Sequence, residues 1–361
     1  MPYIVAGSLL GISLFSIVSY YLIRIKLHLF HFLLLLWMTS YWVSVIFALD
    51  RHSAVLEALK ITFYLPMIML FSLLTPVYRR RLFYQWPWLG AVFVLWGFLF
   101  GLMRDHRLES TLEYANALAI LLLSSLMISM YQWIRTKRWR DGLLILWNGF
   151  GLYWTSSRGV WLILCLLLVA WLIIDYSNLR KRKPVVLLTS LPVMILAISV
   201  LYQNWFGARL RQSFTANHEW STRWSYWQDG WRMIQDNWLW GVGADGWISL
   251  QPDWYYVKYL HHFYLQTWID AGLLAILSFV ALITIPLVHV LSGWWRRLRK
   301  QVENKHEASD LFNSCLSLIS LGFLMHAWMD LPLAYPLLMM MLLMCLYELT
   351  LENEVSWRKK K

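Results

Sequence analysis

Long apolar segments separated by short polar turns make up most of this chain. A segment of about 20 mostly apolar residues is long enough to cross a bilayer as a helix. The pattern predicts eleven membrane-spanning helices, at residues 3–23, 28–49, 58–78, 84–103, 113–134, 142–157, 159–177, 185–203, 262–291, 311–330 and 333–350. We therefore expect an all-α integral membrane protein whose residues 1–361 form a single polytopic domain.

The only long polar segment runs from residue 204 to residue 261. Its apolar side chains recur at helical spacing and fall on one stripe, about 80° wide at 100° per residue. The stripe consists of Trp220, Trp224, Trp227, Trp231, Ile234 and Trp238. Two interpretations are compatible. The helix lies at the membrane interface, where tryptophan is enriched, or it packs this stripe onto the ends of the spans.

Composition supports the membrane assignment. Charged residues make up 14% of the chain and the mean hydropathy is +0.50, whereas soluble domains carry about 25% charged residues. Residues 2–23 lack a basic start and a clear cleavage site, so we do not expect a cleavable signal peptide. The three cysteines, Cys165, Cys315 and Cys345, fall inside predicted spans, which favours packing roles over disulfides or a zinc site.

The net charge of +12 comes from short basic clusters between the spans. This distribution is typical of charges that orient a membrane protein, with Lys and Arg on the cytoplasmic side, and not of a nucleic-acid partner. Placing the N-terminus outside puts 22 of the 32 Lys and Arg residues inside and 10 outside. The sequence therefore predicts a multi-pass protein of the cytoplasmic membrane, with residues 204–261 outside and the C-terminus in the cytoplasm.

Two arginines are candidates for binding an anion on the outer side. Arg158 lies in the tight turn between two predicted spans, next to the hydroxyls of Ser156 and Ser157. An arginine at membrane depth is costly unless it is paired, snorkels to the surface or has a function. Arg223 lies at the edge of the tryptophan stripe, at the level of lipid phosphates. The planar guanidinium matches the geometry of phosphate oxygens, so we expect these arginines to bind an anion.

The run from Gly241 through Gly243 to Gly246 matches the letters of a dinucleotide fingerprint. The fingerprint requires a preceding strand in a βαβ unit, and here a tryptophan-rich helix precedes it, so we reject that interpretation. The run predicts either a turn that ends the helix or a turn whose backbone amides approach an anion.

Histidines and an aspartate are the candidates for acid–base chemistry. His261 and His262 stand where the long loop re-enters the membrane, and either can act as a general base near neutral pH. An interfacial histidine bonded to the backbone is the competing interpretation. Adjacent histidines without a third ligand at helical spacing argue against a metal site. His326 and Asp330 are four residues apart, and the pattern places them on one helical face near the outer end of a span. A functional role and a structural hydrogen-bonded pair both explain such residues.

The motifs of this chain and their order resemble those of the O-antigen ligase and O-antigen polymerase family of bacterial membrane glycosyltransferases. The matching motifs are Tyr114-Ala-Asn-Ala-Leu-Ala119, Thr155-Ser-Ser-Arg-Gly-Val-Trp161, Arg223-Trp-Ser-Tyr-Trp227, Asp236-Asn-Trp-Leu-Trp-Gly-Val-Gly243, His261-His-Phe-Tyr-Leu-Gln266 and Ala271-Gly-Leu-Leu274. The resemblance covers residues 113–335 well and the first hundred residues poorly. His262 stands where the family often has asparagine, and the family commonly has about twelve spans.

The resemblance implies transfer of a glycan from an undecaprenyl (polyprenyl) diphosphate carrier to an acceptor hydroxyl, as a ligase or a polysaccharide polymerase of the cell envelope. The acceptor is a glycan or a lipid core. Carried over by position, Arg158 and Arg223 bind the donor diphosphate and His261 is catalytic. Ser157, Gly241, Gly243, His262, His326 and Asp330 are supporting or alternative residues. We expect no cofactor and no metal, because two arginines can neutralise the leaving group.

Two other function classes compete with the transferase. A transporter or flippase of lipid-linked glycans or small molecules would carry broken helices and polar residues near the bilayer midplane, and few charges lie there. A scaffold or receptor without catalysis would tolerate replacement of Arg158, Arg223 and His261.

Overall fold

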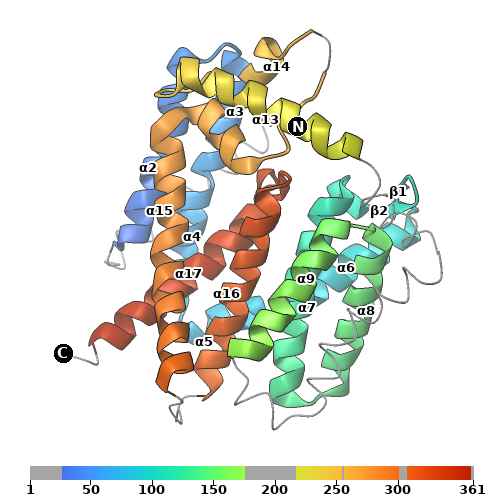
Figure 1. Cartoon of the computed structure of the whole chain (residues 1–361). Helices are drawn as coiled ribbons and strands as arrows, with labels where there is room; N and C mark the ends of the chain where they lie inside the picture. The colour runs from blue at the N-terminus through green and yellow to red at the C-terminus, as the bar shows by residue number, and fades with distance from the viewer. Residues whose placement is uncertain (1–26, 175–216, 254–255, 301–306, 359–361) are drawn as a thin grey trace. The chain divides into compact units, whose positions relative to one another are not determined.

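The computed structural model describes residues 27–174, 217–253, 256–300 and 307–358. These residues fold almost entirely into helices (Figure 1). Within them, strands β1 (Met103–Arg104) and β2 (Arg107–Leu108) form the only sheet, a short antiparallel hairpin. The predicted helical fold class is confirmed for this part of the chain.

Five stretches of helix among the described residues are long and apolar enough to cross a membrane. They are α2 (Leu29–Phe47), α3 with α4 (Arg51–Thr62 and Tyr64–Leu73), α5 with α6 (Pro76–Phe83 and Trp86–Leu99), α7 (Ala115–Thr136) and residues Phe263–Ser292 of α15 (Phe263–Lys300). Shorter apolar helices are α9 (Arg158–Ile174) and parts of α16 (Glu307–Ala327) and α17 (Pro336–Arg358), while α8 (Trp139–Thr155) covers a further predicted span. The predicted spans 3–23 and 185–203 lie outside the described residues, so the count of eleven stays a prediction.

The chain divides into two compact units, each assembled from separate segments. Unit 1 comprises residues 1–79, 220–288 and 327–361. In it, α13 (Asn217–Asn237) lies crosswise at one end of α15 (Figure 1). Aromatic rings pack in the core of this unit, where the Trp37 ring is stacked 6.0 Å from that of Tyr64 and tilted 5.2 Å from that of Phe279. The remaining described elements of this unit are α14 (Gly246–Leu250) and η2 (Pro332–Ala334).

A buried ion pair joins α5 to α17 inside unit 1. Nε of Arg79 donates to Oε2 of Glu348 at 2.5 Å, and Nη1 donates to the carbonyl of Leu74 at 2.6 Å. Both charged side chains are almost fully shielded from solvent. Arg79 belongs to one of the short basic clusters between the spans, Arg79 to Arg81, and the charge pattern alone did not predict this packing role. Removing one partner of such a pair leaves a buried charge, which is strongly destabilising.

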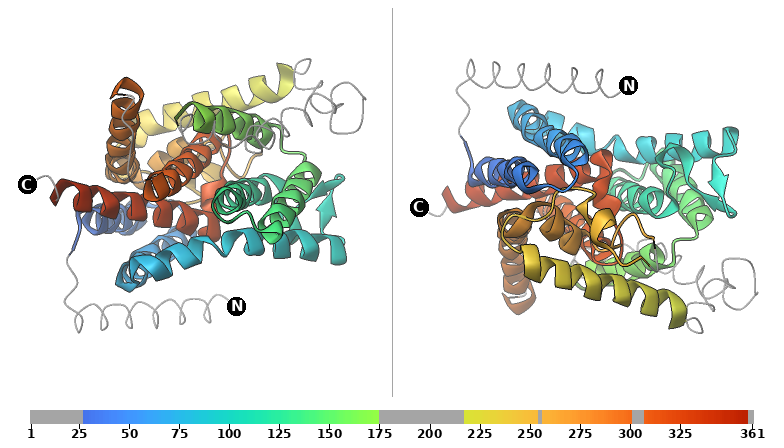
Figure 2. Two further views of the ribbon diagram at one scale, coloured as in Figure 1. Left: turned by 90° about the horizontal axis from the view of Figure 1, so that it is seen from below. Right: turned by 90° about the horizontal axis from the view of Figure 1, so that it is seen from above.

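Unit 2 comprises residues 80–219 and 289–326, and α7 lies at its centre. α7 is apolar on nearly all sides, as expected for a helix that other helices surround. Figure 2 shows α6, α7 and α8 packed next to one another. Small residues allow this close approach: a Cβ on Gly90 would lie 2.3 Å from Oδ1 of Asn148. The β1–β2 hairpin and η1 (Ser110–Leu112) connect α6 to α7.

Helix α13 is amphipathic, but its packed face coincides only in part with the predicted tryptophan stripe. The buried core beneath it contains Met233 and Ile234, together with Trp247, Leu260 and Ile269 from the following segments. Three tryptophans of the stripe, Trp224, Trp231 and Trp238, are instead exposed. The packing interpretation is therefore wrong for these three tryptophans, whereas Ile234 of the stripe is buried. A face that includes Gly230 lets the helix come closer than a face of indole rings.

Candidate functional site

The glycine turn after α13 fits against a break in α15. The amides of Val242 and Gly243 donate to the carbonyls of Ile269 and Asp270 at 2.8 and 3.1 Å. Those carbonyls precede Gly272, whose φ of +74° interrupts the helix. Gly243 has a φ of +80°, and a Cβ on it would lie 2.4 Å from that of Ala48.

The same turn bears on the predicted anion site. The amide of Gly241 donates to the carbonyl of Asn237 at 3.0 Å, so the amides of the turn's first three residues are all used by backbone carbonyls. This arrangement favours a packing role for Gly241 and Gly243 over anion binding.

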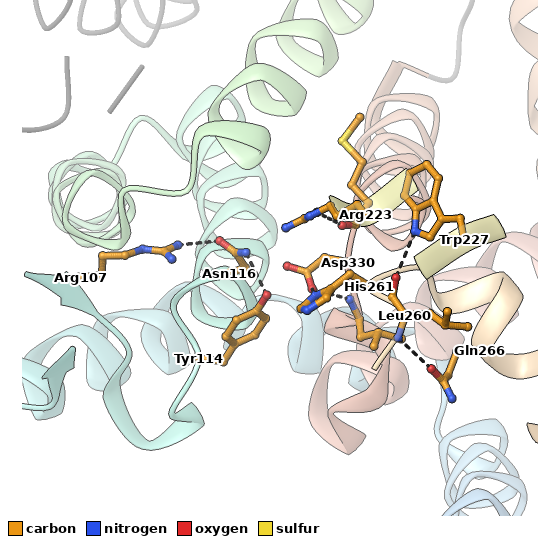
Figure 3. A network of polar contacts seen from close by, with 11 residues as sticks. Arg107, Tyr114, Asn116, Arg223, Trp227, Leu260, His261, Gln266 and Asp330 are labelled. Atoms are coloured by element: carbon orange, nitrogen blue, oxygen red, sulfur yellow. Dashed lines mark hydrogen bonds and ion pairs between the residues drawn. The ribbon is translucent and has the colours of Figure 1, made fainter. Parts of the chain in front are cut away.

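Side chains of α13 and α15 hold the segment that precedes the two histidines (Figure 3). Nε1 of Trp227 donates to the carbonyl of Leu260 at 3.1 Å. The amide of Leu260 donates to Oε1 of Gln266 at 3.2 Å, and Nε2 of Gln266 donates to Oδ1 of Asp270 at 2.9 Å. Because Leu260 is fully buried and fixed at both backbone groups, the position of the next residue is fixed as well.

His261 faces an aspartate from a distant part of the chain. Its Nδ1 lies 3.2 Å from Oδ1 of Asp330, and the same oxygen accepts a bond from the amide of Leu331 at 2.9 Å. The Asp330 side chain is buried, whereas the His261 side chain is 32% exposed. With a proton on Nδ1 directed at the carboxylate, Nε2 is left as an acceptor. The pair thus has the geometry of a base whose orientation is set by a buried acid.

The backbone separates the two adjacent histidines. His261 has a φ of +52°, a conformation that is uncommon outside glycine and turns the chain sharply. His262 is buried, with its ring 4.8 Å from that of Trp328 and 5.1 Å from that of Trp227. Its Nδ1 accepts a bond from the amide of Leu265 in the first turn of α15. Burial lowers the pKa of His262 to about 4, so this imidazole stays neutral near pH 7.

Arg223 lies next to the same segment of chain as Asp330. Its Nη1 donates to the carbonyl of Met329, the residue immediately before Asp330 (Figure 3). The side chain reaches there from α13, the helix whose Trp227 holds Leu260. Unit 1 therefore brings together Arg223, His261 and Asp330 around residues 329–331. An arginine and a histidine–aspartate pair can bind an anion and accept a proton.

Arg158 belongs to unit 2 and begins α9 at the predicted turn. α8 ends at Thr155, and Ser156 adopts a left-handed conformation with φ +50°. The amide of Ser157 donates to Oγ1 of Thr155 at 3.4 Å, and its carbonyl accepts a bond from the amide of Trp161. Ser157 is buried, and its backbone hydrogen bonds stabilise the turn.

Arg107 holds this turn from the β1–β2 hairpin. Its Nε donates to the carbonyl of Thr155 at 2.9 Å, and its Nη2 donates to Oδ1 of Asn116 at 2.7 Å. Nδ2 of Asn116 in turn donates to the hydroxyl of Tyr114 at 3.1 Å (Figure 3). The network thus links the motif that begins at Tyr114 to the end of α8, three residues before Arg158.

The structure corrects the predicted relation between His326 and Asp330. Helix α16 ends at Ala327, so Asp330 is not on a helical face with His326. The helix stops before the second residue of the predicted pair, and the carboxylate of Asp330 contacts His261. Among the residues that the structure describes, no group of three or more His, Cys, Asp and Glu side chains could hold a metal ion.

Sequence reasoning missed the residues that support the candidates. Arg107 was counted only as an outer charge, and Asp270 was not singled out although it lies inside a predicted span. An ionisable residue inside an apolar span is a signal of function, and this signal could have identified Asp270. Gln266 was part of a quoted motif without an assigned role. For Arg107 we find no local signal, because its partners lie 9 and 48 positions away.

The fold and the site together define a helical integral membrane protein with a histidine–aspartate pair and an arginine beside it. Residues 142–280 match the family model described as O-antigen ligase, and this match confirms the family resemblance that the motifs predict. The matched segment contains Arg158, Arg223 and His261. No curated protein matches the chain.

Proposed function

We propose that this protein transfers a glycan from a polyprenyl diphosphate carrier to an acceptor hydroxyl at the outer face of the cytoplasmic membrane. The family match to O-antigen ligase supports glycan transfer. The observation that carries the assignment of residues is the contact between His261 and Asp330, next to Arg223. The acceptor is a glycan or a lipid core, which makes the enzyme a polysaccharide polymerase or a ligase.

In the proposed step, the acceptor oxygen attacks the anomeric carbon of the donor sugar. Nε2 of His261 takes the hydroxyl proton, and the buried carboxylate of Asp330 stabilises the imidazolium that forms. The bond between the anomeric carbon and the diphosphate oxygen breaks, and the electron pair leaves with the diphosphate. Arg223 and Arg158 bind that diphosphate and neutralise its charge, so the reaction needs no divalent metal.

The break in α15 does not favour the transport alternative. In transporters, the carbonyls freed at a broken helix coordinate ions. Here the carbonyls of Ile269 and Asp270, which precede the break, accept backbone amides from the glycine turn. The break therefore has a packing explanation.

The transferase proposal is tested with purified protein and a polyprenyl diphosphate-linked glycan. His261→Ala should lower the rate of glycan transfer by about two to four orders of magnitude, as loss of a general base does. The wild-type rate should be unchanged in EDTA. A His261→Ala variant that folds and transfers glycan normally would exclude this base, and activity lost in EDTA and restored by magnesium or manganese would exclude the metal-free step.

The proposed orientation places the N-terminus and residues 204–261 outside and the C-terminus in the cytoplasm. Tyr256 and Arg81 are both exposed and fall on opposite sides in this topology. In intact cells, an impermeant thiol reagent should label Tyr256→Cys and not Arg81→Cys, with the wild-type chain and its three native cysteines as background. The reverse labelling would invert the topology.

A further inference from the structure

An apolar groove runs along α6 and α8 in unit 2. Its volume is about 730 Å³, within the range of small-molecule sites. Apart from Arg140, the side chains that line it are all apolar or aromatic. The residues that line the groove all belong to unit 2, whereas the histidine–aspartate pair belongs to unit 1.

Two polar side chains of α8 form hydrogen bonds to backbone carbonyls of α6. Nε1 of Trp147 donates to the carbonyl of Ala91 at 3.1 Å, and Nδ2 of Asn148 donates to the carbonyl of Pro87 at 3.1 Å. These bonds fix α8 against α6 and hold the Trp147 ring as one wall. Leu143 and Phe150, on the same helix, remain 54% and 44% exposed along the opening.

The charge in the groove is confined to one end. Arg140 lies in the first turn of α8, next to Trp139, which is 73% exposed. Tryptophan prefers the headgroup level of a bilayer, and basic residues beside a span attract anionic lipid. The opposite end of the groove, at Phe150, has no charged lining residue. This polarity fits a molecule with an anionic head and a hydrocarbon tail.

The length of the groove favours a lipid of one leaflet. Phe150 follows Arg140 by ten residues, which at 1.5 Å per residue is about 15 Å along α8. This is about half of the ~30 Å hydrocarbon core of a bilayer. A polyprenyl diphosphate bound through Arg158 would carry its charge at the far end of α8, where the groove has no charged lining residue.

We propose that this groove binds one acyl chain of an anionic phospholipid whose phosphate contacts Arg140. The bound lipid fills the space between α6 and α8 and covers Leu143 and Phe150. This proposal does not depend on the transferase activity, since it concerns a separate site and a separate ligand.

The test is native mass spectrometry of the purified full-length protein with phosphatidylglycerol, or with phosphatidylcholine of the same acyl chains. Wild-type protein should retain phosphatidylglycerol in preference to phosphatidylcholine. Arg140→Gln should lower that preference about fivefold, as loss of one cation near an anionic headgroup does. Ala91→Phe should fill the groove and abolish retention of both lipids, whereas Val169→Phe, a matched change at an exposed position of α9, should not.

Leu143→Trp is a second groove-filling variant if Ala91→Phe does not fold. Its helicity and elution volume should equal those of the wild type while lipid retention is lost. Equal retention by wild type and either folded groove variant would overturn the proposal. Retention of polyprenyl phosphate in place of phosphatidylglycerol, in a parallel experiment, would also overturn it.

Discussion

Nδ1 of His261 lies 3.2 Å from Oδ1 of Asp330, although the two residues are 69 positions apart in the chain. The carboxylate is buried and also accepts the amide of Leu331, so its position does not depend on the histidine alone. This arrangement gives the imidazole one fixed orientation. It is the contact on which the proposed proton transfer depends.

Replacement of the acid tests that dependence. Asp330→Asn keeps the shape of the side chain but removes the charge, and an amide can present its N–H to Nδ1 and favour the wrong tautomer. We expect the rate of glycan transfer to fall by about 100-fold or more while the protein still folds. Asp253→Asn, an exposed acid in the same outer segment, is the matched control and should retain the wild-type rate. Near-normal transfer by Asp330→Asn would show that the pair is structural.

His262 should behave as a helix cap and not as the base. His262→Asn retains a side-chain acceptor for the amide of Leu265, so transfer should stay within a few-fold of the wild-type rate. Because the pKa of His262 is lowered to about 4, the profile of activity between pH 5.5 and 8 should be the same in both proteins. If His262→Asn abolishes glycan transfer while His261→Ala retains it, the general base is His262 and not His261.

The same depressed pKa predicts how stability depends on pH. Between pH 6.5 and about 4, the unfolded chain binds a proton at His262 that the folded protein does not. Wild-type stability should therefore fall through this group as the pH is lowered across that window, and His262→Asn should lose less stability over it. Thermal unfolding in detergent at pH 7 and pH 5 measures the difference. An equal loss in both proteins would contradict the burial argument.

The two arginines are tested by charge-preserving changes. Lysine keeps the charge but cannot form the bidentate fork, so Arg223→Lys and Arg158→Lys should each reduce transfer at least tenfold. Arg232→Lys on the same helix as Arg223 is the control, because Arg232 is 75% exposed and pairs only with Asp229 among the contacts described for it. If both single variants transfer glycan at the control rate, the arginines have snorkelling or packing roles.

Arg107 should act through the turn before Arg158. Arg107→Gln cannot reach both Thr155 and Asn116, so the turn should loosen and the KM for the lipid-linked donor should rise more than kcat falls. Arg107→Lys, which keeps one bond, should recover part of the loss. Arg104→Gln in the same hairpin is the control, since Arg104 is 63% exposed and bonds to Glu109. A fall in kcat alone, or no effect, would exclude a positioning role.

Local sequence pattern predicted the helices well where apolar length is decisive. α2 and α7 begin and end within two residues of the predicted spans, and the turn at Ser156 and Ser157 occurs where Arg158 interrupts two of them. A helix that crosses a membrane must be long and apolar, and its backbone N–H and C=O groups must bond to one another within the helix. The length of each apolar segment therefore predicts where such a helix begins and ends. The charged boundary positions also revealed Arg158, Arg223 and His261 as candidates, with the family motifs as support.

Helical spacing failed for the pairing of His326 with Asp330. Residues four apart share one face of a helix, but α16 ends between these two, and Asp330 contacts His261 from a distant part of the chain. Spacing likewise gave six apolar residues on α13 without saying which of them pack. The choice depends on what lies beneath, and the close approach at Gly230 turned Trp224 and Trp231 outward.

The sequence by itself determined a helical membrane protein, the side-chain types available for chemistry and their order along the chain. Only the tertiary structure decided that Asp330 orients His261 and that Arg107 holds the turn of Arg158. The physical reason is the range of the interactions. Apolar periodicity acts over a few turns of helix, whereas these contacts join residues tens of positions apart, and the packing of whole helices selects their partners.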